Sequence, residues 1–135
     1  MRYLSLLLLL FCLAGATCER SSQDRHTAVL ALYDKTWLHS NEEDGPDYKV
    51  YRPNTFAFPP SRGRTGFAIE KEGVFRLYTI APTDGLEEHK GEWKMIKPNL
   101  LRVTFPEEEL RGFDLELISI SDALLKVRQN FSGKQ

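Results

Sequence analysis

The sequence predicts an all-β domain in which a single up-and-down antiparallel meander of eight or nine strands closes into a barrel. Apolar and polar residues alternate with a period of two along most segments, which is typical of strands with one face toward a core and one toward water. Turn residues recur about every 8 to 14 positions, near the spacing found in sandwiches and barrels. Short turns favour a meander, and closure removes its unpaired edges.

The individual elements follow from this alternation and its breaks. A short N-terminal helix is expected over residues 27–33, with Ser22 or Asp24 as its cap. Gly45-Pro46 interrupts a loop over 41–47, and Pro59-Pro60 closes a short extended piece. The expected strands cover residues 35–38, 48–51, 55–58, 66–71, 74–80, 92–96, 101–105, 113–117 and 125–127.

The strand pattern also assigns the inward faces, which are rich in large rings. An eight-stranded barrel has room either for packed side chains or for one small ligand. The alternation does not separate these two outcomes, and both stay open here. If a cavity exists, we expect the residues that line it to be Phe67, Phe75, Trp93, Met95 and Phe105. The other large residues expected on the inward faces are Leu77, Phe113 and Leu117.

The first 18 residues are typical of a secretory signal peptide. Arg2 gives a positive end, residues 4–13 are almost entirely apolar, and small residues follow. The apolar run of about 10 residues is shorter than the roughly 20 needed to span a membrane. We therefore expect cleavage after Ala16 or Cys18 and a secreted, extracellular protein. Thr17 and Gly15 fit a lipid anchor on Cys18 poorly.

The rest of the chain is expected to form one domain with loose ends. Residues 19–27 are predicted to be a flexible segment, 28–129 the barrel and 130–135 a disordered tail. Both cysteines lie within or at the edge of the leader, so packing alone must hold the domain. Asn130-Phe131-Ser132 forms an acceptor triplet for N-linked glycosylation at Asn130.

Charge and motif content argue against several classes of function. The net charge is −1, and acidic and basic residues are interspersed, which disfavours nucleic-acid and membrane partners. Neither the acidic run over 41–47 nor that over 107–109 has the spacing of a calcium loop. We expect no metal, no cofactor and no enzymatic activity. A catalytic pair formed by Asp84 and His89 is the alternative that the residue types leave open.

Three arginines in the first half of the domain have two interpretations. Arg52, Arg62 and Arg64 can bind a carboxylate or phosphate through paired hydrogen bonds. The favoured alternative is structural: one of them stacks on Trp37 or Trp93, with Asp84 or Glu42 as its ionic partner. Arg128 is a further candidate for the stacking role.

Three stretches together resemble the lipocalin-like domains of the calycin group. They are Trp37 after a short helical segment, the run over 50–64, and Thr83-Asp84-Gly85 followed by Gly91-Glu92-Trp93. Lipocalins usually have glycine where this chain has Lys35, and tyrosine where it has Gly85. The resemblance covers about residues 28 to 128, and it implies a cup that holds a small apolar molecule.

Two functions follow as expectations. The first is a secreted lipocalin-like binding protein that carries a small hydrophobic ligand in the barrel. The alternative is a non-enzymatic extracellular interaction protein, such as an inhibitor or matrix component, with a filled core. In that case residues 19–26 and 41–47 would contact a protein partner.

Overall fold

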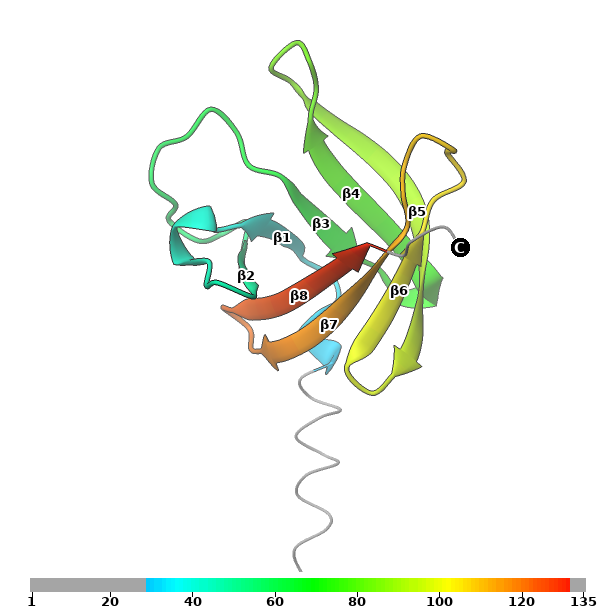
Figure 1. The fold of residues 1–135 in the computed structure, drawn as a ribbon. Coiled ribbons are helices and arrows are strands. Elements are labelled where there is room, and N and C mark those ends of the chain that lie inside the picture. The colour runs from blue at the N-terminus through cyan, green and yellow to red at the C-terminus, as the bar shows by residue number, and fades with distance from the viewer. Residues whose placement is uncertain (1–28, 132–135) are drawn as a thin grey trace, which may run out of the picture. The chain divides into compact units, whose positions relative to one another are not determined.

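The computed structural model describes residues 29–131, and its eight antiparallel strands close into a barrel (Figure 1). The predicted all-β class, antiparallel meander and barrel closure are confirmed. The chain divides after Leu30, and the second unit contains the barrel. The strands are β1 (Thr36–His39), β2 (Lys49–Pro53), β3 (Gly66–Ile69), β4 (Val74–Ile80), β5 (Leu86–Lys97), β6 (Leu100–Thr104), β7 (Phe113–Ile120) and β8 (Leu125–Phe131).

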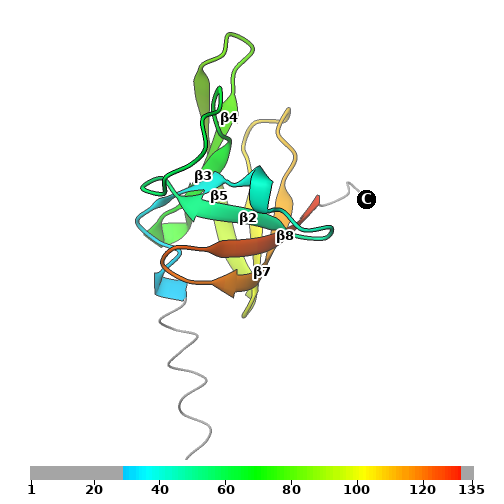
Figure 2. The same ribbon diagram turned by 90° about the vertical axis from the view of Figure 1, so that its left-hand side faces the viewer.

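The strand order departs from a simple meander at one connection, because β2 and β3 follow each other in the chain but are not neighbours in the barrel. From β3 to β8 each strand pairs with the next, whereas β1 pairs with both β2 and β3, and β2 pairs with β8. Since all these pairs are antiparallel, β2 and β3 run in the same direction. Residues 54–65, here called the crossover segment, must therefore return along the barrel past β1, on the side that Figure 2 turns toward the viewer.

Backbone hydrogen bonds fix the crossover segment at both of its ends. The N–H of Asn54 donates to the carbonyl of Thr36 at 2.9 Å, and the N–H of His39 donates to the carbonyl of Thr65 at 2.9 Å. The strand expected over 55–58 is not formed, because this stretch belongs to the crossover and pairs with no neighbouring strand.

One strand matches its predicted bounds, and the others are shifted, shorter or longer. β4 has the predicted bounds, while β5 begins six residues before the predicted start at Glu92, because Leu86–Gly91 still pair with β4. β8 runs through Asn130 and Phe131, two residues beyond the predicted end of the barrel domain. Short 3-10 turns, η2 (Asn41–Glu43) and η3 (Lys71–Gly73), lie in two of the connections.

The core occupies the inside of the barrel, as the alternation predicts. Its largest fully buried side chain is Trp37, whose indole N–H donates to the carbonyl of Leu32 at 3.1 Å. This bond satisfies a buried polar group and ties the segment before β1 to the barrel. Other core members are Tyr51, Phe67, Ile69, Phe75, Leu101, Val103, Phe113, Leu115, Leu117, Leu125 and Val127.

Several predictions fall at or beyond the edges of the described chain. Val29 and Leu30 are helical, in line with the predicted N-terminal helix. The signal peptide (1–18), the flexible segment (19–27), residue 28 and residues 132–135 of the predicted tail lie outside the described residues. Residues 27 and 28 of the expected helix are therefore not described. Between residues 29 and 131, no helix is both long enough and apolar enough to cross a membrane.

Candidate functional site

The predicted ligand-lining residues mostly meet inside the barrel, but they pack against one another. The rings of Phe67 and Phe75 stack with their centroids 5.4 Å apart. Phe105 and Phe113 meet Phe75 at 6.2 and 5.8 Å, and Tyr51 meets Phe67 at 4.7 Å. These separations are those of favourable aromatic pairs. The five rings form a continuous aromatic column through the barrel.

The two remaining predicted residues are not part of this column, although Trp93 is partly buried and packs against the core. Trp93 packs on Tyr33 at 5.8 Å and donates its indole N–H to the carbonyl of Glu70 at 2.8 Å. Met95 was expected in the interior, but its exposed fraction is 38%. The alternation of β5 puts Met95 on the side of Trp93, yet the pairing register shifts just beyond Met95. Met95 lies opposite the buried Leu101 and so keeps the inward side of β5, but it is too exposed to line a closed cavity.

A recess lies inside the barrel, beside Tyr51, Phe67 and Phe113 of the aromatic column. Its volume is about 120 Å³, whereas pockets for drug-sized ligands measure about 300 to 1,000 Å³. Phe67, Leu77, Phe113 and Leu115 line its apolar part, and His39, Lys49, Tyr51 and Gln129 contribute polar groups. The interior is thus mostly filled by side chains.

The rim of this recess is held by hydrogen bonds and stacking. The Nε2 atom of His39 lies 2.8 Å from Oδ2 of Asp44, whose Oδ1 accepts the N–H of Val50 at 2.8 Å. The His39 ring stacks on Tyr51 at 5.1 Å. Burial, aided by the negative charge of Asp44, raises the pKa of Tyr51 to about 12. The phenol therefore stays protonated near neutral pH and is unsuited to act as a base.

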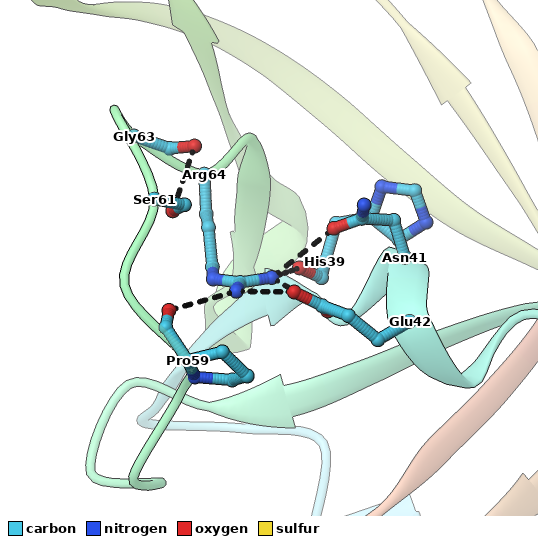
Figure 3. Close-up of polar contacts among 7 residues, drawn as sticks. All are labelled: His39, Asn41, Glu42, Pro59, Ser61, Gly63 and Arg64. Carbon is cyan, nitrogen blue, oxygen red and sulfur yellow. Dashed lines mark hydrogen bonds and ion pairs between the residues drawn. The ribbon is translucent and has the colours of Figure 1, made fainter.

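Arg64 has the structural role that the sequence favoured (Figure 3). Its Nη atoms donate to both carboxylate oxygens of Glu42, at 2.9 and 2.6 Å, and to the carbonyls of His39 and Pro59. Only 7% of the side chain is exposed. The predicted partner Glu42 is confirmed. The stacked ring is different, because Arg64 lies 4.5 Å from the centroid of Phe58 in the crossover segment.

Arg52 binds a carboxylate of η2 in the same way. The pairs Arg64–Glu42 and Arg52–Glu43 are called the arginine clamps below. Arg52 donates to both oxygens of Glu43 at 2.8 and 2.6 Å, and to the carbonyl of Ala123 at 2.8 Å. Its guanidinium lies 4.9 Å from the centroid of Phe56. Arg52 and Arg64 thus connect η2 to β2 and to the crossover segment, which leaves neither guanidinium free to bind an anion.

No arginine between residues 29 and 131 stacks on either tryptophan. Lys35 lies 5.4 Å above the Trp37 ring. Arg128, the other predicted candidate, pairs with Asp47 at 2.9 Å and with Glu116 at 2.7 Å. Arginine stacking on Trp37 or Trp93 was therefore a wrong expectation. The rings that the arginines contact, Phe56 and Phe58, lie in the crossover segment, and the local sequence pattern does not predict where that segment lies in the fold.

A larger concave surface lies outside the barrel. This outer groove has a volume of about 660 Å³ and runs over the outer faces of β1, β3 and β4, next to the start of the crossover segment. Thr36, Asn54, Thr55 and Tyr78 supply uncharged hydrogen-bonding groups to its lining. The sequence signal for these residues is weak, since they belong to the polar faces of strands or to a loop.

Charges of both signs line the outer groove, and acids are in excess. Arg76 is hydrogen-bonded to both Glu70 and Glu88, which raise the pKa of the guanidinium. Lys35 pairs with Asp122 at 3.3 Å, and Asp34 completes the charged lining. Four acids and two bases line the groove, and Asp34 also pairs with Lys71 at 3.3 Å, so the groove is slightly acidic.

The candidate catalytic and metal-binding groups do not assemble. His89 contacts Glu107 through Nδ1 at 3.0 Å and Thr79 through Nε2 at 3.2 Å. Asp84 lies in the turn between β4 and β5 and forms no hydrogen bond or ion pair with His89, so the catalytic pair that the residue types left open is not formed. Over the described part of the chain, no group of three or more histidine, cysteine or acidic side chains is placed to hold a metal ion.

The chain therefore belongs to the class of small eight-stranded antiparallel barrels, and its architecture is compatible with a calycin-like fold. Comparison with known proteins adds no closer assignment, because no family model, curated protein or solved structure matches the chain.

Proposed function

We propose that this chain is a secreted, non-enzymatic binding protein that engages an extracellular partner at the outside of a filled barrel. One observation carries the proposal. The interior recess measures about 120 Å³, while the outer groove measures about 660 Å³. Of these two spaces, the groove falls within the usual size range of binding pockets and the recess does not.

The leader sequence supports export. A positive end, a short apolar run and small residues before Cys18 are typical of secretory signal peptides. The absence of catalytic activity is part of the same proposal, and it is supported by the positions of the candidate groups. His89 is engaged by Glu107 and Thr79, and burial keeps Tyr51 protonated.

The groove also suggests the chemistry of the partner. Its hydrogen-bonding side chains and excess of acids fit a polar protein segment that carries basic or amide groups. An apolar ligand of fatty-acid or retinoid size has less support, because the aromatic column occupies the space that such a ligand would need.

A titration tests the filled interior. Fatty acids and retinol are added to the protein while tryptophan emission is recorded, and we expect no saturable change. The matched variant is Phe75→Ala, which removes a fully buried ring. This variant should gain binding of a benzene-sized probe, since apolar cavities of that size take up such molecules. Saturable binding of a fatty acid by the unaltered chain would refute the filled-barrel interpretation.

Cross-linking tests the outer groove. A photo-reactive amino acid is placed at Thr55, in the groove, or at Ile118 on β7, on the opposite side of the barrel. In the extracellular fluid of the producing organism, we expect a protein adduct from position 55 and none from position 118. Equal adducts from both positions would mean that the groove has no special role.

A further inference from the structure

Two β-bulges turn isoleucine side chains to the outside at one end of the barrel. The pairing of β5 with β6 skips Ile96, and the pairing of β7 with β8 skips Ile118. A bulge inserts an extra residue into one strand and redirects a side chain there. Both isoleucines are 45% exposed. In each strand the inserted residue is thus a large apolar side chain that faces water.

The two isoleucines lie on either side of Leu100 in β6. Leu100 pairs with Lys97, next to Ile96 in β5, and with Glu116, two positions before Ile118 in β7. Since neighbouring strands lie about 4.8 Å apart, Ile96, Leu100 and Ile118 gather on one outer face and are called the apolar patch. In Figure 1 the turn from β5 to β6 lies at the lower end of the barrel, away from the projecting β4–β5 hairpin.

Basic side chains surround the apolar patch. From the Lys94–Arg102 pair to the turns, the outer faces of β5 to β8 carry five bases and two acids. The bases are Lys94, Lys97, Arg102, Lys126 and Arg128, and the acids are Asp114 and Glu116. Both acids are already paired with arginines, at 2.9 and 2.7 Å. Within residues 29–131, the three lysines are left without an ion pair.

The ladder itself shows an excess of positive charge here. Lys94 lies directly opposite Arg102, and like charges across an antiparallel pair are destabilising. Asp114 offsets the charge of Arg102 only. Lys126 lies 4.9 Å from the centroid of the Tyr48 ring. An anionic surface facing these strands would offset the repulsion that the described side chains leave in place.

A lipid surface suits this combination better than a protein does. The apolar patch is far smaller than the roughly 800 Å² that each partner buries in a stable protein interface, and neither the interior recess nor the outer groove includes any of its residues. A bilayer takes up single apolar side chains without a complementary shape, and anionic lipids attract basic residues. A second copy would bring the same positive charges and be repelled.

We propose that the outer face of the barrel at the β5–β6 turn docks on an anionic lipid surface. The apolar patch enters the boundary between headgroups and acyl chains, and the three lysines contact the headgroups. So few side chains predict weak, reversible binding. Although the net charge of the whole chain is −1, docking depends on the local charge of this face. The inference is independent of the proposed function, because the outer groove lies over β1, β3 and β4.

Co-sedimentation of the exported chain with vesicles tests the proposal. Vesicles that mix phosphatidylglycerol with phosphatidylcholine should bind the chain, vesicles of phosphatidylcholine alone should not, and salt should release it. Lys97→Glu should weaken binding on the order of tenfold, since each base near an anionic surface contributes roughly fivefold. Ile96→Ser combined with Ile118→Ser should weaken binding at least as much, because the apolar contact is lost.

Two matched variants at the other end of the barrel separate the apolar patch from general effects. Lys90→Glu makes the same change of charge on the same strand, and Leu86→Ser removes a side chain that is 66% exposed. Both should leave vesicle binding unchanged, and thermal unfolding should confirm that every variant is folded.

Three results would overturn the proposal. The first is no binding of the unaltered chain to the anionic vesicles, which requires no variant. The second is an equal loss of binding from Lys97→Glu and Lys90→Glu, which would show that only net charge matters. The third is a protein cross-linked at position 118 in the extracellular fluid, which would assign this face to a protein partner instead.

Discussion

Two arginine clamps show how single residues hold the irregular part of this fold. Arg64 and Arg52 each bind a carboxylate of η2 with two hydrogen bonds, and each lies over a phenylalanine of the crossover segment. The planar fork of arginine matches a carboxylate in a way that lysine does not. Each clamp therefore fixes the geometry of a loop that has no strand neighbour of its own.

Replacing the buried arginine tests this role. Arg64→Lys keeps the charge but loses the paired hydrogen bonds to Glu42 and the contact with the Phe58 ring. We expect a fall of several degrees in Tm, measured by circular dichroism. Arg102→Lys is the matched control, because Arg102 also forms two bonds to one carboxylate but is half exposed. A loss in the control equal to that of Arg64→Lys would contradict a special role for Arg64.

The same clamps predict how stability depends on pH. Hydrogen bonds from Arg64 and Arg52 lower the pKa values of Glu42 and Glu43 to about 2, from an ordinary value of 4.5. A carboxylate with a depressed pKa in the folded state stabilises the fold above its unfolded pKa, and this contribution is lost as the pH falls. The stabilisation is thus full above about pH 4.5 and disappears toward pH 2.

Urea unfolding across this range provides the measurement. Between pH 4.5 and pH 2, the free energy of unfolding should fall less steeply in the double variant Glu42→Gln and Glu43→Gln than in the unaltered chain. High salt should reduce the difference, because both carboxylates are partly exposed. Parallel pH profiles for the two proteins would show that these carboxylates titrate normally.

Among the elements, β1 has the most demanding position. It has only four residues, yet it pairs with both β2 and β3, the two strands that the crossover segment connects. Gly66 is the first residue of β3 and pairs with Leu38 of β1. A Cβ atom on Gly66 would lie 2.2 Å from the carbonyl oxygen of Trp37, closer than any real contact. A side chain at position 66 would therefore push the two strands apart.

Gly66→Ala should destabilise the protein by about 1 to 3 kcal/mol, the usual cost of overpacking a tight site. Gly85→Ala is the control, since a Cβ atom on Gly85 meets nothing within 4 Å and its backbone is not in the left-handed region. Urea unfolding of the two variants gives the comparison. If both alanines cost the same, the close approach of β1 and β3 is not what limits position 66.

At the scale of the whole molecule, the barrel derives its stability from a filled interior, because the predicted domain contains no cysteine to cross-link it. The aromatic column connects β2, β3 and β4 with β7 and the residue that follows β6. Phe75 lies at the centre of this column and is fully buried. Its ring contacts three others, so it links both halves of the barrel.

Phe75→Ala should therefore cost about 3 to 5 kcal/mol, the range for deleting a buried aromatic ring. Phe131→Ala, at a position where 65% of the side chain is exposed, should change stability by about 0.5 kcal/mol or less. Chemical denaturation measures both variants. A small loss for Phe75→Ala would indicate a loosely packed interior with more room than the recess alone provides.

The sequence by itself determined the approximate positions of the eight strands and most of their inward faces, and β4 is formed over its predicted bounds. It also predicted a strand over 55–58 that is not formed. Alternation is a local property, so Phe67, Phe75 and Phe113 could be assigned to the interior without knowing their neighbours. Local pattern also named Glu42 as an ionic partner. It failed at Met95, because burial near a strand end depends on what the rest of the fold covers.

Only the tertiary structure decided the position of β1 between β2 and β3, the phenylalanines that the arginines contact, and the volume left inside the barrel. Strand order depends on pairing between residues far apart in the chain, and a period of two is the same in any order. The volume of the recess is a small difference between two large volumes, that enclosed by the strands and that occupied by the inward side chains. That difference is set by how the rings pack, which no local pattern contains.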